Sequence, residues 1–162
     1  MLPAEVRDLL SGEPGDDAWE PVAHLLTTGD DGFPRVCLLS RAELAARQDG
    51  IGCVVRATHT IANLRRDGKA LLVVTGERAA HYVRLRVRTI IGADRGPDGG
   101  NNADGGNGDD PERVAVAFDV VGAEADTLGI PLRPMMFHSS SRVRHLEHWD
   151  DNREFLERLG FG

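Results

Sequence analysis

The chain has 162 residues, of which 41% are hydrophobic and 28% charged, with a formal net charge of −7. This length fits one domain, and the composition is that of an ordinary globular protein. The acidic balance argues against nucleic acid as a partner, because phosphate backbones need a net basic face. No run approaches the roughly 20 apolar residues of a membrane span, and the N-terminus lacks a signal-peptide pattern. We therefore expect a cytoplasmic protein.

The first half of the chain is predicted to hold a helix followed by strands. A helix is expected in residues 2–12, where leucine and valine share one face. Strands follow at 22–28 and 34–40, and the glycine-containing connection GDDGF joins them as a hairpin. Residues 41–47 read as a short helical or irregular excursion. A third strand, rich in Ile and Val, covers 51–57.

The second half begins with a crossover helix at about 60–67 and a strand at 69–75. In the strand at 79–92, apolar residues alternate with Arg84, Arg86 and Arg88. This arginine stripe suits either a solvated sheet face or an anion-binding or dimer surface. The Gly-, Asp- and Asn-rich residues 96–110 predict a flexible insertion. A sixth strand at 113–125 and a C-terminal helix at 150–160 complete the chain.

Together these elements predict a mainly β fold in one domain, residues 1–162. About six antiparallel strands, one short crossover helix and helices near both ends describe a small β-barrel with peripheral helices. Cys37 and Cys53 lie in its apolar runs, which predicts buried free thiols in a reducing compartment.

The start of the crossover helix gathers groups that bind anions. Backbone N–H groups at a helix N-terminus carry partial positive charge and attract phosphate. Thr58, His59 and Thr60 add donors there, and arginine side chains that suit phosphate stand nearby in the sequence at 35, 56, 65 and 66. In the alternative interpretation, Thr58 only caps the helix and the arginines are solvated.

Three segments in order, TTGDDGFPRVCLLS, THTIANLRRD and KALLVV, resemble the pyridoxamine 5′-phosphate oxidase-like proteins, the FMN-binding split-barrel family. The resemblance covers residues 18–92 best. It implies a split β-barrel, and a homodimer that binds one FMN per subunit in clefts between the two subunits. It also implies a flavin-dependent oxidoreductase, for which the sequence identifies neither the small-molecule substrate nor a catalytic side chain.

Carried over by position, the resemblance puts the FMN phosphate at Arg35 and Thr58, with His59 and Thr60 as further contacts. It puts the flavin ring along the backbone of two strands. These strand residues are Val36, Cys37, Leu38, Leu39 and Ser40 on the first strand, and Val54, Val55 and Arg56 on the second.

The chain departs from the family pattern at three places. Thr60 stands where the family has a helix-start Lys, and Ser40 stands where the oxidases commonly have Lys. Arg158 is followed by Leu159, so the C-terminal Arg-x-His element is absent. These departures predict that the protein is not a true pyridoxamine phosphate oxidase. They leave open the deazaflavin F420 as cofactor, and a non-catalytic dimer that binds flavin or haem.

Two further features of the sequence each allow two interpretations. His145 and His148 could share a helical face and bind a metal, but a solvated or capping role is preferred and no metal site is predicted. Trp149 is expected to pack in the core, although it could cover a cofactor edge.

Overall fold

The computed structural model describes residues 1–92 and 113–161, so the predicted insertion at 96–110 lies outside the described residues. In chain order the elements are α1 (Ala4–Leu10), β1 (Trp19–Pro21), β2 (Ala23–Thr28), β3 (Pro34–Leu39), the 3-10 helix η1 (Arg41–Glu43), β4 (Leu44–Ala46), β5 (Gly50–Val55), α2 (Thr58–Asp67), β6 (Lys69–Thr75), β7 (Ala80–Gly92), β8 (Val114–Asp126), β9 (Met136–His138), α3 (Ser141–Leu146) and α4 (Trp149–Arg158).

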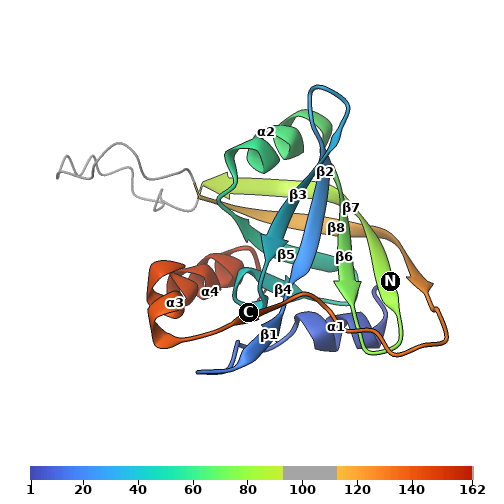
Figure 1. Ribbon diagram of the computed structural model, residues 1–162. Helices are drawn as coiled ribbons and strands as arrows, with labels where there is room; N and C mark the ends of the chain where they lie inside the picture. The colour runs from blue at the N-terminus through green and yellow to red at the C-terminus, as the bar shows by residue number, and fades with distance from the viewer. Residues whose placement is uncertain (93–112, 162) are drawn as a thin grey trace.

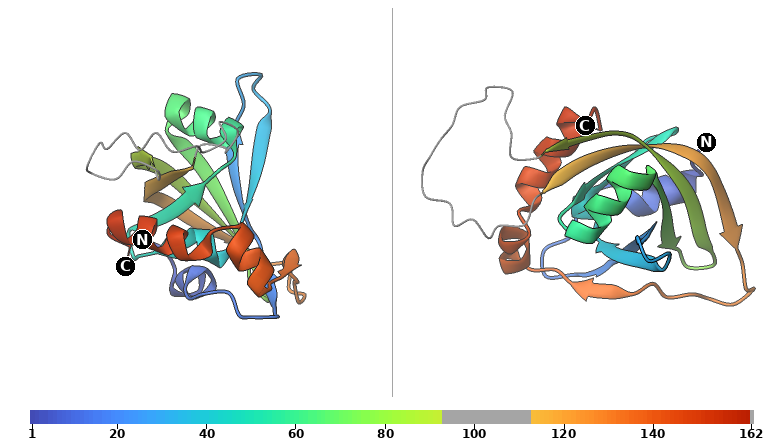
Figure 2. Two further views of the ribbon diagram at one scale, coloured as in Figure 1. Left: turned by 90° about the vertical axis from the view of Figure 1, so that its left-hand side faces the viewer. Right: turned by 90° about the horizontal axis from the view of Figure 1, so that it is seen from above.

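Seven strands form one antiparallel sheet in the order β3-β2-β6-β7-β8-β5-β4. The sheet curls into a half-barrel, seen from above in Figure 2, so that its two ends approach each other. We call the line along which β3 faces β5 the seam. The prediction of a mainly β fold with an antiparallel barrel, a crossover helix and helices near both ends is confirmed (Figure 1).

Two helices complete the interior of the barrel from opposite ends, α2 at the top of Figure 1 and α1 at the bottom. Ile61 and Leu64 of α2 are buried in the same core cluster as Val6 and Leu10 of α1. Burial of such side chains contributes about 1.5–3 kcal/mol each. Helix α2 ends at Gly68, whose φ of 63° is a left-handed conformation that a side chain disfavours.

Helix α4 covers the outer face of the sheet through a second, smaller core. Val54 of β5 turns to this side and packs with Phe155 and Leu156 of α4 and with Phe161. Gly52 makes the close approach possible, because a Cβ there would lie 2.9 Å from the Phe161 ring. The C-terminal segment is thereby held against β5, next to the seam.

Several short elements were not predicted. The excursion expected at 41–47 resolves into η1 and the strand β4, and β1 pairs with β9 in a separate two-stranded sheet. Helix α3 is a further addition. Elements of three to six residues carry too few side chains to show a period, and distant pairing stabilises them instead.

The arginine stripe of β7 lies on the solvated face of the sheet. Arg84 pairs with Glu124 at 3.2 Å, and Arg88 donates from Nε to Asp119 at 2.6 Å, both across to β8. β-Bulges interrupt the register of β7 with β8 after Arg84 and after Val87. The second bulge shifts the alternation by one residue. Ile90 consequently packs against the barrel core and Ile91 against the α4 core.

Both cysteines are free, with Cys37 half-buried and Cys53 buried. Within residues 1–92 and 113–161, no helix is long and apolar enough to cross a membrane.

Candidate functional site

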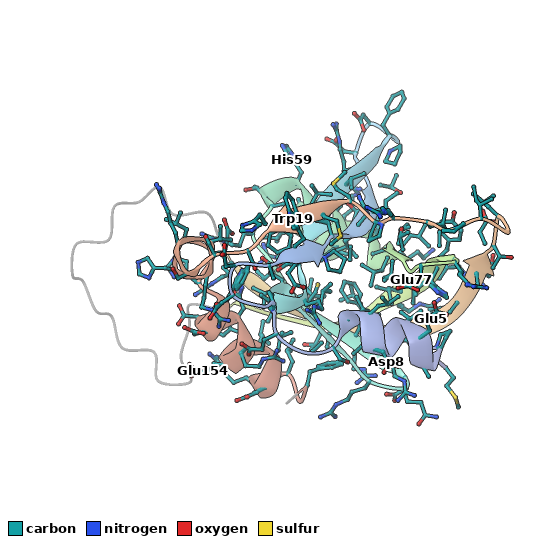
Figure 3. All side chains as sticks on the ribbon, turned by 60° about the horizontal axis from the view of Figure 1, so that its bottom comes forward. Glu5, Asp8, Trp19, His59, Glu77 and Glu154 are labelled. Carbon is teal, nitrogen blue, oxygen red and sulfur yellow. The ribbon has the colours of Figure 1, made fainter. Side chains whose placement is uncertain are left out.

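The N-terminus of α2 carries no side-chain cap. Its N-cap position is Ala57, which has no side-chain oxygen to accept from the first N–H groups, and its first turn contains no acidic residue. Thr58 and His59 are exposed there, and Figure 3 shows His59 at the outer surface of the helix. The alternative in which Thr58 caps the helix is therefore not what is found. An uncapped helix start without acidic neighbours suits an anion.

Arg35 is engaged within its own hairpin. Its guanidinium pairs with Asp31 of the same hairpin at 2.7 Å, and both side chains are about half exposed. Its Nε lies 3.1 Å from the position that a Cβ on Gly29 would take, so the side chain folds back over the turn. An Arg35 contact with a phosphate at Thr58 requires the side chain to leave Asp31.

Thr60 faces the barrel and not the solvent. Thr60 is 3% exposed, and its hydroxyl lies near the Cys37 thiol of β3. Burial raises the pKa of the Cys37 thiol, with a further contribution from Glu43, and the bond to Thr60 works against both. Thr60 therefore lies between the start of α2 and β3, and its contact with a phosphate stays a prediction.

A cleft opens beside the seam where β3 ends. It has a volume of about 320 Å³ and is lined by side chains from β3, β9, α3 and α4. Its main apolar lining residues are Leu38, Leu39, Phe137, Val143 and Trp149. Three polar residues, Ser40, Glu43 and Glu147, complete the wall. We call this feature the Glu43 cleft.

Glu43 is held at the cleft by a capping box. Its Oε2 accepts from the Ser40 backbone N–H at 2.6 Å and from the Ser40 hydroxyl, which in turn accepts from the Ala42 N–H at 3.2 Å. Burial raises the pKa of the Glu43 carboxyl above its ordinary 4.5. The bonds from Ser40 act against this shift, Glu147 adds to it, and Arg56 opposes it. The site thus contains a partly buried carboxyl group whose pKa is raised by its burial.

Arg56 connects the cleft to the start of α2. It follows β5 directly, two residues before Thr58, and its Nη1 lies 3.4 Å from Oε2 of Glu147. Glu147 lines the Glu43 cleft. The helix start and the cleft are consequently neighbours along one side of the molecule.

The residues predicted to lie along a flavin ring divide into three groups. Leu38, Leu39 and Ser40 line the Glu43 cleft. Val54 and Val55 are buried at 1% and 0% exposure, so only their backbone could meet a ligand. Beyond Cys53 the register of β5 with β4 ends, which leaves that backbone edge unpaired by β4. Val36 points outward and is 56% exposed.

Two larger hollows lie away from these residues. One, of about 520 Å³, is bounded by Leu9 of α1 and by residues 131–134, and Figure 3 shows Glu77 of its lining close to α1. The other, of about 580 Å³, is bounded by Arg78 and residues 127–131. Neither is lined by a predicted site residue.

The histidines form no metal site in the described part of the chain, where no group of three or more potential ligands is found. His148 stands at the N-cap of α4 in a left-handed conformation, φ 51°, and pairs with Asp151 at 3.5 Å. His148 thus occupies the N-cap position, but its half-exposed side chain makes no capping hydrogen bond, which fits the solvated role that the sequence also allowed.

Sequence comparison finds no relatives: no protein-family model matches the chain, and no curated protein does. Solved structures do match. A candidate pyridoxamine 5′-phosphate oxidase from Lactobacillus delbrueckii has a TM-score of 0.53 at 16% identity, over 76% of this chain and 93% of that one. A Clostridium acetobutylicum protein related to general stress protein 26 of B. subtilis, of the pyridoxinephosphate oxidase family, has a TM-score of 0.51 at 15% identity, over 83% and 92%.

The chain has the fold of the pyridoxamine 5′-phosphate oxidase-like proteins. A conserved hypothetical protein of Mycobacterium tuberculosis shares this fold, with a TM-score of 0.50 at 18% identity over 83% of this chain and 92% of that chain. At these identities the likeness is one of fold, and it confirms the family resemblance at that level.

Sequence reasoning missed part of the cleft wall of this oxidase-like fold. Glu43, Phe137, Val143 and Glu147 were not predicted as site residues. One signal was present, because Ser40-Arg41-Ala42-Glu43 has the spacing of a capping box. The other three come from segments about 100 residues away, and no local pattern points to the seam.

Proposed function

We propose that the protein binds FMN along the seam and acts as a flavin-dependent oxidoreductase distinct from pyridoxamine phosphate oxidase. The uncapped start of α2, with exposed Thr58 and His59, is the observation that carries the proposal. It would hold the phosphate, with Arg56 adjacent and Arg35 recruited from Asp31. Thr60 would support this site from below.

The residues present fit the rest of the cofactor. The unpaired edge of β5 at Val54 and Val55 offers backbone hydrogen-bonding groups to a ring, and the end of β3 offers the same from Leu38 to Ser40. When bound, the flavin supplies the redox chemistry, while the protein orients it and shields it from water. A homodimer would cover the outward face of β3, where Val36 and Leu38 are more than half exposed.

The test is a titration of the purified protein with FMN, riboflavin, F420 and haem, followed by absorbance and by flavin fluorescence. We expect FMN to bind more tightly than riboflavin, which lacks the phosphate. If F420 or haem binds more tightly than FMN, that molecule is the cofactor and FMN is not. Failure of all four at high micromolar concentration would reject the proposal.

A further inference from the structure

The Glu43 cleft has the dimensions and lining of a small-molecule site. Its volume of about 320 Å³ is at the lower end of the usual range for ligand pockets. Its apolar walls come from four separate elements, with Leu38 on β3, Phe137 on β9, Val143 on α3 and Trp149 at the start of α4. Such a wall, made of side chains that meet only in the folded chain, favours an apolar ring or short chain.

Few polar groups at the cleft are available to a ligand. The Ser40 hydroxyl and Oε2 of Glu43 are engaged with each other, whereas Oε1 of Glu43 makes no hydrogen bond to any described residue. The indole Nε1–H of Trp149 also lacks an acceptor among the described residues, although the side chain is only 4% exposed. Buried polar atoms are normally satisfied, so an unsatisfied donor on one lining residue and an open carboxyl oxygen on another leave two groups for a ligand to satisfy.

The charges around the cleft select against anions. Glu43 and Glu147 both line it, and the cation beside it, Arg56, is already paired with Glu147 at 3.4 Å. An anionic group entering there would meet the Glu147 carboxylate, and Glu43 as well once that group is ionised, with no lysine or arginine among the described residues that line the cleft. Ser40 also stands where the oxidases commonly have lysine, so that positive charge is missing and anions are disfavoured further.

We propose that the Glu43 cleft binds the substrate, and that this substrate is an uncharged small molecule with an apolar body and one oxygen that hydrogen-bonds to Glu43. The assignment as substrate rests on the proposed function, since the cleft adjoins the end of β3 where the flavin ring would lie. Binding of a small molecule in the cleft does not depend on the flavin and can be tested without it. The raised pKa of Glu43 supports the choice, because the protonated carboxyl donates to a carbonyl oxygen.

Few other ionisable groups face the Glu43 carboxyl group. Cys37 on β3, Cys53 on β5, Arg56 after β5 and Glu147 after α3 are the ionisable groups that face it. Burial raises the pKa of both thiols, so they stay neutral. A carbonyl ligand should therefore bind more weakly once Glu43 loses its proton, and this change should follow Glu43 alone.

The experiment uses flavin-free ¹⁵N-labelled protein and three probes that share one ring and differ in charge: acetophenone, benzoate and benzylamine. Binding is read from the indole N–H signal of Trp149 in the NMR spectrum, assigned with the Trp19→Phe variant. We expect acetophenone to shift this signal at lower concentration than benzoate, which the carboxylates repel, and than benzylamine, whose ammonium group would lose hydration between the apolar walls. Preference for either charged probe, or no shift with any of them, overturns the proposal.

Variants test the role of Glu43. Acetophenone should bind about 3- to 10-fold more tightly at about pH 5 than at about pH 8, the ratio expected for one hydrogen bond. Glu43→Gln keeps a neutral donor and should abolish this pH dependence, whereas the control Glu124→Gln, at an exposed glutamate that pairs with Arg84 and does not line the cleft, should retain it. Val143→Phe should block the cleft without touching the carboxyl group. Loss of the pH dependence in Glu124→Gln, or its persistence in Glu43→Gln, contradicts the assignment.

The two proposals fail separately. If FMN does not bind but acetophenone does, the proposed function is wrong and the ligand site stands. If FMN binds and acetophenone leaves the Trp149 signal unchanged, the ligand site is wrong and the proposed function stands.

Discussion

The Arg35 guanidinium pairs with the Asp31 carboxylate of its own hairpin at 2.7 Å. The family resemblance assigns Arg35 to a phosphate, and Asp31 is therefore its competitor. Because both side chains are about half exposed, the pair contributes at most about 1 kcal/mol and can be exchanged for a stronger partner.

Arg35→Ala should weaken FMN binding by about 1.5–3 kcal/mol, the range for a charge-assisted hydrogen bond. Riboflavin should lose much less, and Asp31→Asn should strengthen FMN binding by up to about 1 kcal/mol because Arg35 is released. The measurement is fluorescence titration, with Arg84→Ala on the solvated sheet face as control. Equal losses for FMN and riboflavin would show that Arg35 does not contact phosphate.

Glu43 should make stability depend on pH. Its pKa is raised above 4.5 in the folded protein, so at intermediate pH the folded state holds a proton that the unfolded state has released. The free energy of unfolding should therefore fall as pH rises from about 4.5 through the raised value. Denaturant unfolding at a series of pH values should show this fall in the wild type and a smaller one in Glu43→Gln. A fall of the same size in Glu43→Gln would assign it to other groups.

A buried hydrogen bond helps to anchor α2 to β2. Nδ2 of Asn63 donates to Oγ1 of Thr27 at 2.9 Å, and both residues are 5% exposed. Asn63→Ala should lower the free energy of unfolding by about 1–3 kcal/mol, because Thr27 keeps a buried hydroxyl without its partner. The double variant Asn63→Leu with Thr27→Val should recover most of that loss, as measured in urea. A double variant no more stable than Asn63→Ala would contradict this account.

The homodimer predicted from the sequence should form through β3. This strand ends the sheet, and Val36 is 56% exposed on its outer face. We expect a dimeric mass by light scattering at micromolar concentration, and a monomeric mass for Val36→Glu, in which two like charges would approach across the two-fold axis. Val121→Glu, equally exposed on β8, should remain dimeric. A monomeric wild type would reject the assembly.

The flavin-loaded protein should not oxidise pyridoxine or pyridoxamine 5′-phosphate. Ser40 stands where the oxidases commonly have lysine, and Glu43 and Glu147 line the cleft beside it. A phosphate dianion would therefore find carboxyl groups in place of cations. The loss of charge-assisted contacts worth about 1.5–3 kcal/mol each lowers the rate by several powers of ten. An oxidase assay that gave turnover near about 1 per second would overturn this prediction.

The sequence alone determined the long elements and their order. Helix α2 begins two residues before its predicted start, strand β6 matches its predicted range, and β7 differs by one residue. Such elements are set by neighbours in the chain, because the side-chain period of a strand or helix is visible over seven or more residues. The hairpin of β2 and β3 follows for the same reason, from turn residues next to alternating strands.

Only the tertiary structure decided what the seam contains. Cys37 and Thr60 meet there from β3 and α2, and Glu43 and Glu147 meet from segments about 100 residues apart. The sequence predicted Thr60 and Arg35 as phosphate contacts, but it could not show that Thr60 turns to Cys37 and Arg35 to Asp31. Which way a polar side chain turns depends on the partner that packing brings within hydrogen-bonding distance, and that partner is fixed when the curled sheet brings β3 to face β5.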